Sequence, residues 1–191
     1  MFIQTESTPN PRTLKFLPGR DVLGAGSRDF ADPTAAAASP LAQLVMALDG
    51  VERVYLGGDF LTVTKAEAIE WPHLKPHVLA AIMDHFMSGR PVLLEAGVEQ
   101  DADEAQIAYE GDAAGIVKEI KDIIEARVRP AVARDGGDIT FHSWDHEAGV
   151  VRLNMRGSCA GCPSSALTLK QGIENLLKHY VPEVTRVEQV V

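Results

Sequence analysis

The sequence predicts an α+β protein made of two small mixed domains that an acidic linker joins. Apolar residues recur at intervals of three and four, as in helices, and at intervals of two, as in strands, in both halves of the chain. A stretch without a single lysine or arginine separates the halves. With 191 residues, 46% hydrophobic and 24% charged, the chain has the size and composition of about one or two globular domains.

The N-terminal domain is predicted over residues 1–95 from alternating turn and periodic signals. Pro9-Asn10-Pro11 marks a turn between two short strands. Ser39-Pro40 matches an N-cap followed by a first-turn proline, so a helix is expected to begin there. Gly57-Gly58-Asp59 separates two apolar runs and predicts a hairpin. The expected elements are strands over residues 2–5 and 13–16, a helix over 40–48, strands over 51–56 and 60–64, and a helix from about residue 72.

An acidic linker is predicted over residues 96–112. No lysine or arginine occurs between Arg90 and Lys118. The acidic residues of this interval are Glu95, Glu99, Asp101, Asp103, Glu104, Glu110 and Asp112. A stretch so rich in one charge and so poor in apolar residues does not form a core of its own. We therefore expect the second domain to span residues 113–191.

The C-terminal domain is predicted to follow the order α-β-β-α-β. Isoleucines at helical spacing indicate a first helix that ends at Pro130 and at the turn Asp135-Gly136-Gly137-Asp138. A backbone with positive φ explains the glycines of that turn better than a calcium loop does, because the longer run of oxygen ligands is missing. The remaining expected elements are antiparallel strands over about residues 139–142 and 151–156, a helix over about 163–179, and a last strand over 184–190.

The only two cysteines, Cys159 and Cys162, lie between a predicted strand end and a predicted helix start. Two cysteines exclude a multi-disulfide scaffold and favour metal or redox chemistry. The positive end of a helix dipole lowers the pKa of a cysteine placed there, and the thiolate is the form that binds metal. Gly157 and Gly161 permit the tight turn that lets both sulfurs converge on one centre.

The number of sulfurs limits what one chain can hold. An iron-sulfur cluster or a tetrahedral zinc ion takes about four ligands, and one chain offers two. Unless histidines or an external thiol complete the shell, two chains must share the metal.

Three other interpretations of Cys159 and Cys162 are open at this point. Both could be small buried hydrophobic residues, although burial does not explain the flanking glycines. A thioredoxin-like dithiol oxidoreductase also places its cysteines at a helix start, but here the proline follows the pair. A zinc-stabilised dimeric interaction module would use the same ligands.

The surrounding residues resemble those of a known family. The C-terminal half is similar to the NifU C-terminal domain in Arg129-Pro130, Asp135-Gly136-Gly137-Asp138, Gly157 to Ser165, Thr168-Leu169, Gly172-Ile173-Glu174 and Pro182-Glu183-Val184. The N-terminal half resembles the first domain of two-domain Nfu proteins in Thr5 to Pro11, Thr13 to Phe16, Asp59-Phe60 and Thr62 to Lys65. The resemblance covers nearly the whole chain except the acidic linker.

The resemblance implies an iron-sulfur cluster scaffold or carrier and not an enzyme. Cys159 and Cys162 match the cluster-binding motif, so a 4Fe-4S cluster would be held between the loops of two subunits in a homodimer; a 2Fe-2S form is left open. Implied partners are apo iron-sulfur proteins as acceptors and upstream cluster assembly proteins as donors. The N-terminal domain would contact partners or tune the carrier domain.

The six histidines are weak candidates for further metal ligands. His73 and His77 share a helix face, but no other ligand accompanies them at suitable spacing, and we expect ordinary helix residues. His142 and His146 flank a predicted turn and fit exposed polar positions. The sequence contains no catalytic constellation.

Charge and hydropathy limit partners and location. A formal net charge of −9 without a basic stripe argues against nucleic acid. No apolar stretch reaches the roughly 18 residues of a membrane span. The amino-terminal residues lack the pattern of a signal or transit peptide. We therefore expect a bacterial cytoplasmic protein, with the mature form of a mitochondrial protein as the alternative.

Overall fold

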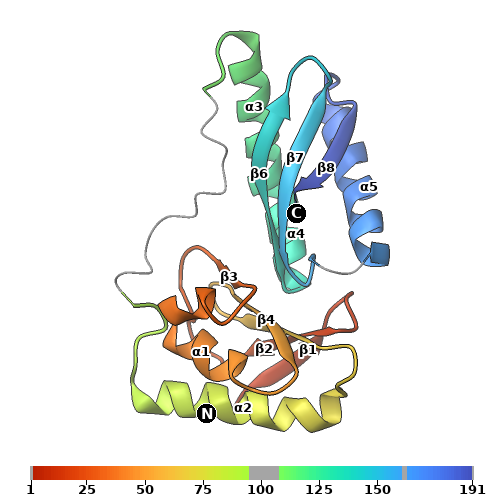
Figure 1. The fold of residues 1–191 in the computed structure, drawn as a ribbon. Coiled ribbons are helices and arrows are strands. Elements are labelled where there is room, and N and C mark those ends of the chain that lie inside the picture. Colours follow the sequence, from red (N-terminus) through yellow and green to blue (C-terminus); the bar gives the residue numbers. More distant parts are fainter. Residues whose placement is uncertain (1, 95–107, 161–162, 191) are drawn as a thin grey trace. The chain divides into compact units, whose positions relative to one another are not determined.

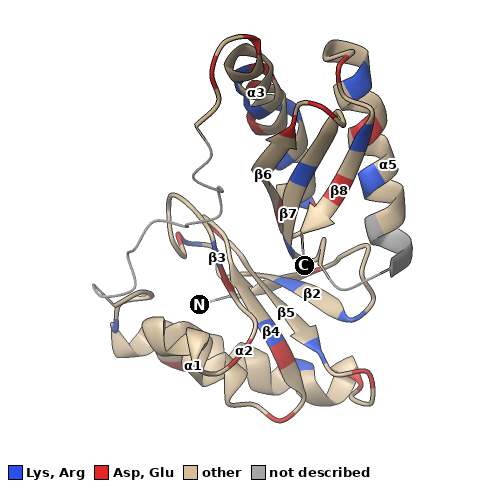
Figure 2. Ribbon diagram, turned by 45° about the horizontal axis from the view of Figure 1, so that its top comes forward, with Lys and Arg blue, Asp and Glu red and all other residues tan. Residues whose placement is uncertain are grey.

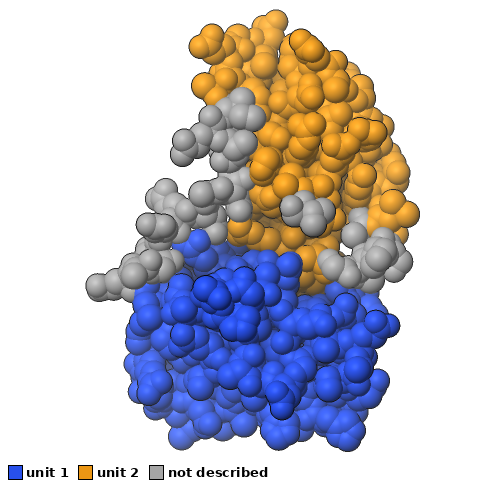
Figure 3. Space-filling model, viewed as in Figure 1, with its two compact units in different colours: residues 1–100 blue, residues 101–191 orange. Residues whose placement is uncertain are grey.

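A computed structural model describes residues 2–94, 108–160 and 163–190, the side chains of 163–166 excepted. The chain forms two compact units, Met1–Gln100 and Asp101–Val191 (Figure 3). Each unit combines a sheet with helices, which confirms the predicted α+β class (Figure 1). No helix within the described ranges is long and apolar enough to cross a bilayer.

The first unit is an antiparallel sheet covered by helices. Its five strands lie in the order β1-β2-β5-β4-β3. Their bounds are Gln4–Ser7 for β1, Thr13–Leu17 for β2, Arg28–Phe30 for β3, Val51–Leu56 for β4 and Leu61–Lys65 for β5. Helices α1 (Pro40–Met46) and α2 (Trp71–Ser88) pack on this sheet with a 3-10 turn, η1 (Ala35–Ala38) (Figure 1).

Local signals placed most of these elements correctly. Ser39 caps α1, since its hydroxyl accepts the Ala42 N–H at 3.1 Å. The predicted hairpin is β4–β5, which pairs Leu56 with Leu61. The short strand β3, which pairs with β4, was not predicted. Buried apolar side chains from the sheet and both helices form one core that includes Phe16, Leu41, Val45, Leu61, Val78 and Ile82.

The second unit follows the predicted order. Helix α3 (Asp112–Ile123) passes through one π-helical turn, η3 (Ile124–Val128), into α4 (Arg129–Arg134). Strands β6 (Gly137–Asp145) and β7 (Val150–Gly157) form an antiparallel pair. Helix α5 (Pro163–Tyr180) then crosses to β8 (Arg186–Val190), which pairs parallel to β7. Figure 2 shows lysine, arginine, aspartate and glutamate distributed over elements of both units.

The first helix does not end at Pro130 as predicted. It continues to Arg134 because Pro130 lies in the first turn of α4, directly after the π turn. A proline there does not need the N–H that it lacks. Gly136 then ends the helix with a φ of 79° and donates its N–H to Ala133 O at 3.1 Å, which confirms the positive φ expected of this turn.

Candidate metal centre at the cysteine loop

The cysteine loop begins where β7 ends. Gly157 has a φ of 59°, a value that favours glycine, and turns the chain out of the sheet. Cys159 follows two residues later, and α5 begins at Pro163, so the predicted position between strand and helix is confirmed for Cys159. Cys162 and Gly161 lie outside the described residues.

Hydrogen bonds join the cysteine loop to the turn that precedes β6. Ser158 donates its N–H to Gly136 O at 3.1 Å and its hydroxyl to Asp135 O at 2.6 Å. Within the loop, the Cys159 N–H donates to Arg156 O at 3.2 Å. Ser158 is 3% exposed, so these bonds form where water does not compete. Two segments more than twenty residues apart in sequence therefore make one structural unit.

Gly137 leaves the space that Cys159 Sγ occupies. A Cβ at position 137 would collide with Cys159 Sγ and would lie 2.9 Å from Arg156 O. Both approaches are far closer than van der Waals contact. From the sequence we attributed both Gly136 and Gly137 to turn geometry. The structure shows instead that Gly137 is required because Cys159 Sγ lies so close to it. The pair of adjacent glycines at a strand start was the only available signal.

Cys159 is 6% exposed and packs in the core of the second unit. Burial raises the pKa of its thiol to about 12. The carboxylates of Asp135 and Asp138 act in the same direction, and a hydrogen bond with Ser158 opposes them. The expectation of a lowered pKa is therefore wrong for Cys159, because loss of hydration outweighs the helix dipole.

An ion-pair network includes Asp138, the residue directly after Gly137. The Arg129 guanidinium donates from Nε to Asp138 Oδ1 and from Nη2 to Asp138 Oδ2, both at 2.8 Å. Its Nη1 reaches Glu125 Oε1 at 2.7 Å. These contacts raise the pKa of Arg129, with the Asp138 hydrogen bond as the largest cause. The sequence indicated no such pairing, because nothing local links an arginine to an aspartate nine residues away.

The donor set near the loop suits a soft metal but is incomplete. A thiol in a glycine-lined, water-poor site matches the sulfur ligation of iron-sulfur clusters and zinc. Among the residues that the structure describes, no three His, Cys, Asp or Glu side chains could hold a metal ion together. The described part of one chain therefore does not provide a full coordination shell.

The four histidines considered as ligands lie at the surface or beside polar and aromatic neighbours. His73 and His77 are exposed on α2 and line a surface hollow of about 430 Å³ together with Asp49. His142 Nδ1 lies 3.1 Å from Ser143 Oγ. The His146 ring packs against Trp144 with 6.4 Å between centroids. That these histidines are not ligands stays a prediction, which iron binding by the isolated first unit would contradict.

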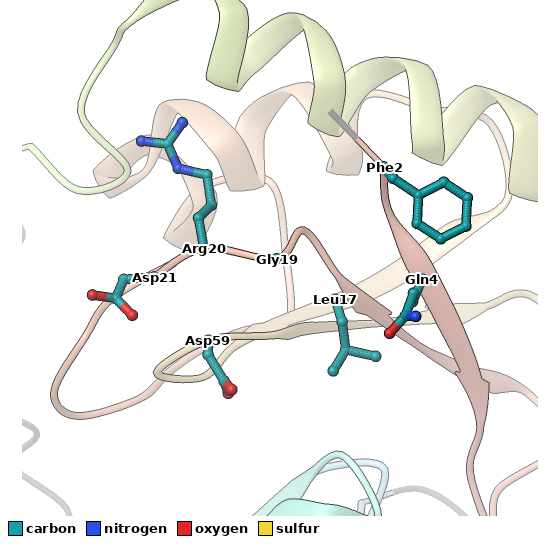
Figure 4. Close-up of a pocket in the computed structure, with 7 residues that line it drawn as sticks. All are labelled: Phe2, Gln4, Leu17, Gly19, Arg20, Asp21 and Asp59. Carbon is teal, nitrogen blue, oxygen red and sulfur yellow. The ribbon is translucent and has the colours of Figure 1, made fainter.

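Another surface hollow of the first unit, of about 470 Å³, lies beside β1 (Figure 4). Its charged lining residues are Arg20, Asp21 and Asp59. In Figure 4 the Arg20 side chain points toward α2 and away from Asp59, and its guanidinium lies 4.9 Å from the Phe86 ring centroid. Within the described part of the chain, its lining contains no cysteine or histidine.

Comparison with known proteins matches both units. The family described as "Scaffold protein Nfu/NifU N terminal" matches residues 3–89, and the "NifU-like domain" matches residues 120–188. Relatives include NifU-like protein 4, mitochondrial, of Arabidopsis thaliana, which is 50% identical over 99% of this chain and 66% of its own length. NifU-like protein 5, mitochondrial, of the same plant is 49% identical over 99% of this chain and 68% of its own length.

A third relative carries a functional name. The NFU1 iron-sulfur cluster scaffold homolog, mitochondrial, of Drosophila sechellia is 51% identical over the whole chain and 65% of its own length. The chain thus spans about two thirds of the length of these relatives. A solution structure of a NifU-like protein from Saccharomyces cerevisiae is 29% identical, with a TM-score of 0.45 over 50% of this chain and 86% of that one.

These relatives correct the predicted location. The expectation of a bacterial cytoplasmic protein is wrong, because the similar proteins that cover the whole chain are mitochondrial. Targeting segments are removed from mature proteins and are separate from the folded domains. The scaffold description of the family agrees with the prediction of a carrier rather than an enzyme.

The chain belongs to the NifU-like family of iron-sulfur cluster scaffold proteins, with an Nfu N-terminal domain and a NifU-like C-terminal domain.

Proposed function

We propose that this protein carries a 4Fe-4S cluster bound by Cys159 and Cys162 of two subunits and transfers it to apo iron-sulfur proteins. The observation that carries the proposal is the placement of Cys159 in a glycine-lined loop of a chain that has only two thiols. The iron-sulfur scaffold relative, which matches the whole chain, supports the nature of the cargo. Upstream assembly proteins would supply the cluster.

The environment of Cys159 suits a carrier better than a dithiol oxidoreductase. A redox dithiol attacks as a thiolate, so it needs a pKa near or below the ambient pH. Burial raises the pKa of Cys159 to about 12, which disfavours the thiolate that such an attack needs. A metal-bearing cargo would supply positive charge that displaces this proton, so cargo binding favours the thiolate.

Sharing between subunits follows from the number of ligands. Two sulfurs per chain satisfy half of the shell of one cluster, so loading is expected to pair two NifU-like domains. We assign cluster binding to residues 113–191 and contact with partners, or tuning of the carrier, to residues 1–95, joined by the segment 96–112.

Substitution of the cysteines tests the ligands. Cys159→Ser and Cys162→Ser should each abolish retention of the cluster after anaerobic reconstitution with iron and sulfide. The far-UV circular dichroism should be unchanged, because serine is nearly isosteric with cysteine. Visible absorption, iron, sulfide and zinc are measured on every sample. A chain that takes up zinc and no iron would favour the zinc-stabilised interaction module instead.

The mass of the loaded protein tests whether two subunits share one cluster. Full occupancy should give about two irons per chain in a species of twice the chain mass. Sedimentation under anaerobic conditions, with and without reconstitution at matched concentration, measures both states. Because the cargo binds only the paired state, dilution should dissociate the unloaded protein first. A loaded monomer with about four irons would contradict the shared site.

A further inference from the structure

The carboxylate of Asp138 is fixed from two sides. Asp138 is 5% exposed, and each of its oxygens accepts one hydrogen bond from the Arg129 guanidinium at 2.8 Å. Oδ1 also accepts the Ile139 N–H at 2.8 Å. A buried carboxylate is tolerated only with such partners. The backbone at the start of β6 is therefore held in place by a side chain of α4.

The fixed backbone is the one that borders the cysteine. Gly137, directly before Asp138, pairs with Gly157 in the sheet, and Asp138 pairs with Arg156. Gly137 also faces Cys159 Sγ at a distance that leaves no room for a Cβ. A shift of Asp138 would thus move the surface against which Cys159 lies.

Arg129 is itself held by the helix that carries it. It follows the π turn Ile124–Val128 and precedes Pro130, whose ring restricts the backbone of the residue before it. Its contact with Glu125 is weaker support, because the Glu125 side chain is 64% exposed. A planar guanidinium matches a carboxylate with two parallel bonds, which lysine cannot do.

We propose that the Arg129–Asp138 pair positions Cys159 for cluster binding, with Arg129 as a positioning residue that acts through Asp138 and the neighbouring Gly137. This inference rests on the proposed function, and it adds a residue to the site that the cysteine motif does not contain. Groups that orient metal ligands typically change metal affinity by about 10- to 100-fold when they are removed.

The experiment compares Arg129→Gln, Arg129→Lys and Asp138→Asn with the wild type in the full chain. Glu125→Gln is the matched control, since it removes the exposed partner of Arg129 and leaves Asp138 paired. Two readouts are taken from each variant. The first is the rate at which an iron chelator removes the reconstituted cluster. The second is the rate of Cys159 alkylation by iodoacetamide without cargo, in a Cys162→Ser background that leaves one thiol.

We expect the three pair variants to keep the circular dichroism of the wild type. They should lose the cluster about 10- to 100-fold faster, and Cys159 should be alkylated at least about tenfold faster, because the loop no longer rests against a fixed strand start. Glu125→Gln should match the wild type in both readouts. Arg129→Lys should behave like Arg129→Gln in the chelator assay, since it keeps the charge and loses the two-bond geometry.

Three results would overturn the inference. Folded pair variants with unchanged chelator and alkylation rates would show that the pair does not position the loop. Unfolding of even Arg129→Lys would show that the pair holds the domain and not the loop. A Glu125→Gln variant as defective as Arg129→Gln would show that Arg129 acts through Glu125 and not through Asp138. If the wild type bound no cluster, the proposed function would fail, while the alkylation rates would still decide whether Arg129 positions Cys159.

Discussion

At the scale of single residues, Gly137 shows how the absence of a side chain creates a site. Its Cα lies where any larger residue would collide with Cys159 Sγ and with the backbone of Arg156 and Cys159. The neighbouring Gly136 is required for a different reason, its φ of 79°. Adjacent glycines thus meet two separate physical demands, one for space and one for conformation.

Gly137→Ala should destabilise the second unit by about 1–3 kcal/mol, because a methyl group there forces the sheet and the loop apart. The cluster should also be retained less well. Gly115→Ala is the matched control. A methyl group added to Gly115, in α3, would meet no atom within 4 Å, so alanine should stabilise the helix by about 0.5–1 kcal/mol. Urea unfolding measures both, and a neutral Gly137→Ala would contradict the packing argument.

His85 is the clearest buried polar residue of the first unit. It lies on the core face of α2 and has no exposed surface, and neither ring nitrogen has a hydrogen-bond partner in the described structure. Burial lowers its pKa below the ordinary value of 6.5, and the charges of Arg90 and Arg20 add to this effect. The folded protein therefore holds His85 neutral.

The pH dependence follows from that pKa. The unfolded chain takes up a proton as the pH falls through about 6.5, whereas the folded chain resists protonation until a lower pH. The stability contributed by neutral His85 is thus present above about pH 6.5 and is lost below it. Relative to His85→Leu, the wild type should lose stability between about pH 8 and about pH 5 in urea unfolding. The exposed control His73→Leu should follow the wild type, and parallel curves for all three would refute the assignment.

At the scale of elements, helix α5 protects the free edge of strand β8. The Glu174 carboxylate accepts the Val187 N–H at 3.0 Å from its Oε2 and binds Lys178 Nζ at 2.7 Å from its Oε1. Both contacts lower the pKa of Glu174, and the hydrogen bond with Lys178 is the larger cause. A side chain thus satisfies an edge N–H that would otherwise be open to another strand.

Glu174→Ala should lower the free energy of unfolding by about 1–2 kcal/mol, because it leaves the N–H of the buried Val187 unpaired. Lys178→Ala should cost only about 0.3–0.5 kcal/mol, since it removes an i,i+4 pair and leaves the edge contact intact. The advantage of Glu174 is present above the pKa of the unfolded carboxyl and is lost as the pH falls through its lowered folded pKa. Chemical denaturation at neutral and acidic pH measures these effects. Equal costs for the two variants would mean that the ion pair, and not the edge contact, matters.

At the scale of the whole molecule, the two units have separate cores. The buried clusters of the first and second unit share no residue. Tyr109 lies in the predicted linker but packs against the second cluster. Its ring contacts Phe141, and its hydroxyl accepts the Trp144 N–H at 2.7 Å. Each unit thus contains the apolar contacts that a domain needs to fold alone.

Fragments 1–94 and 108–191 should therefore both fold, and only the second should bind iron and sulfide. Circular dichroism and reconstitution measure the two properties. A fragment that begins at residue 113 should be less stable by about 1–2 kcal/mol, because it lacks the hydrogen bond and ring contact of Tyr109 and also the first residue of α3. Iron bound stoichiometrically to fragment 1–94 would contradict this division and return attention to His73 and His77.

Features that depend on neighbouring residues could be predicted from the amino-acid sequence. Periodicity indicated the order α-β-β-α-β and so put Cys159 between a strand and a helix, now β7 and α5, and Ser39 marked the start of a helix. These predictions succeeded because helix spacing, strand alternation and capping involve residues only a few positions apart.

The surroundings of Cys159 emerged only from the folded chain. Its raised pKa, the space left by Gly137 and the Arg129–Asp138 pair all arise where α4, β6 and the end of β7 meet. The parallel pairing of β8 likewise depends on how α5 crosses the sheet. Desolvation and ion pairing act between residues that are close in space and not in sequence, so no local pattern encodes them.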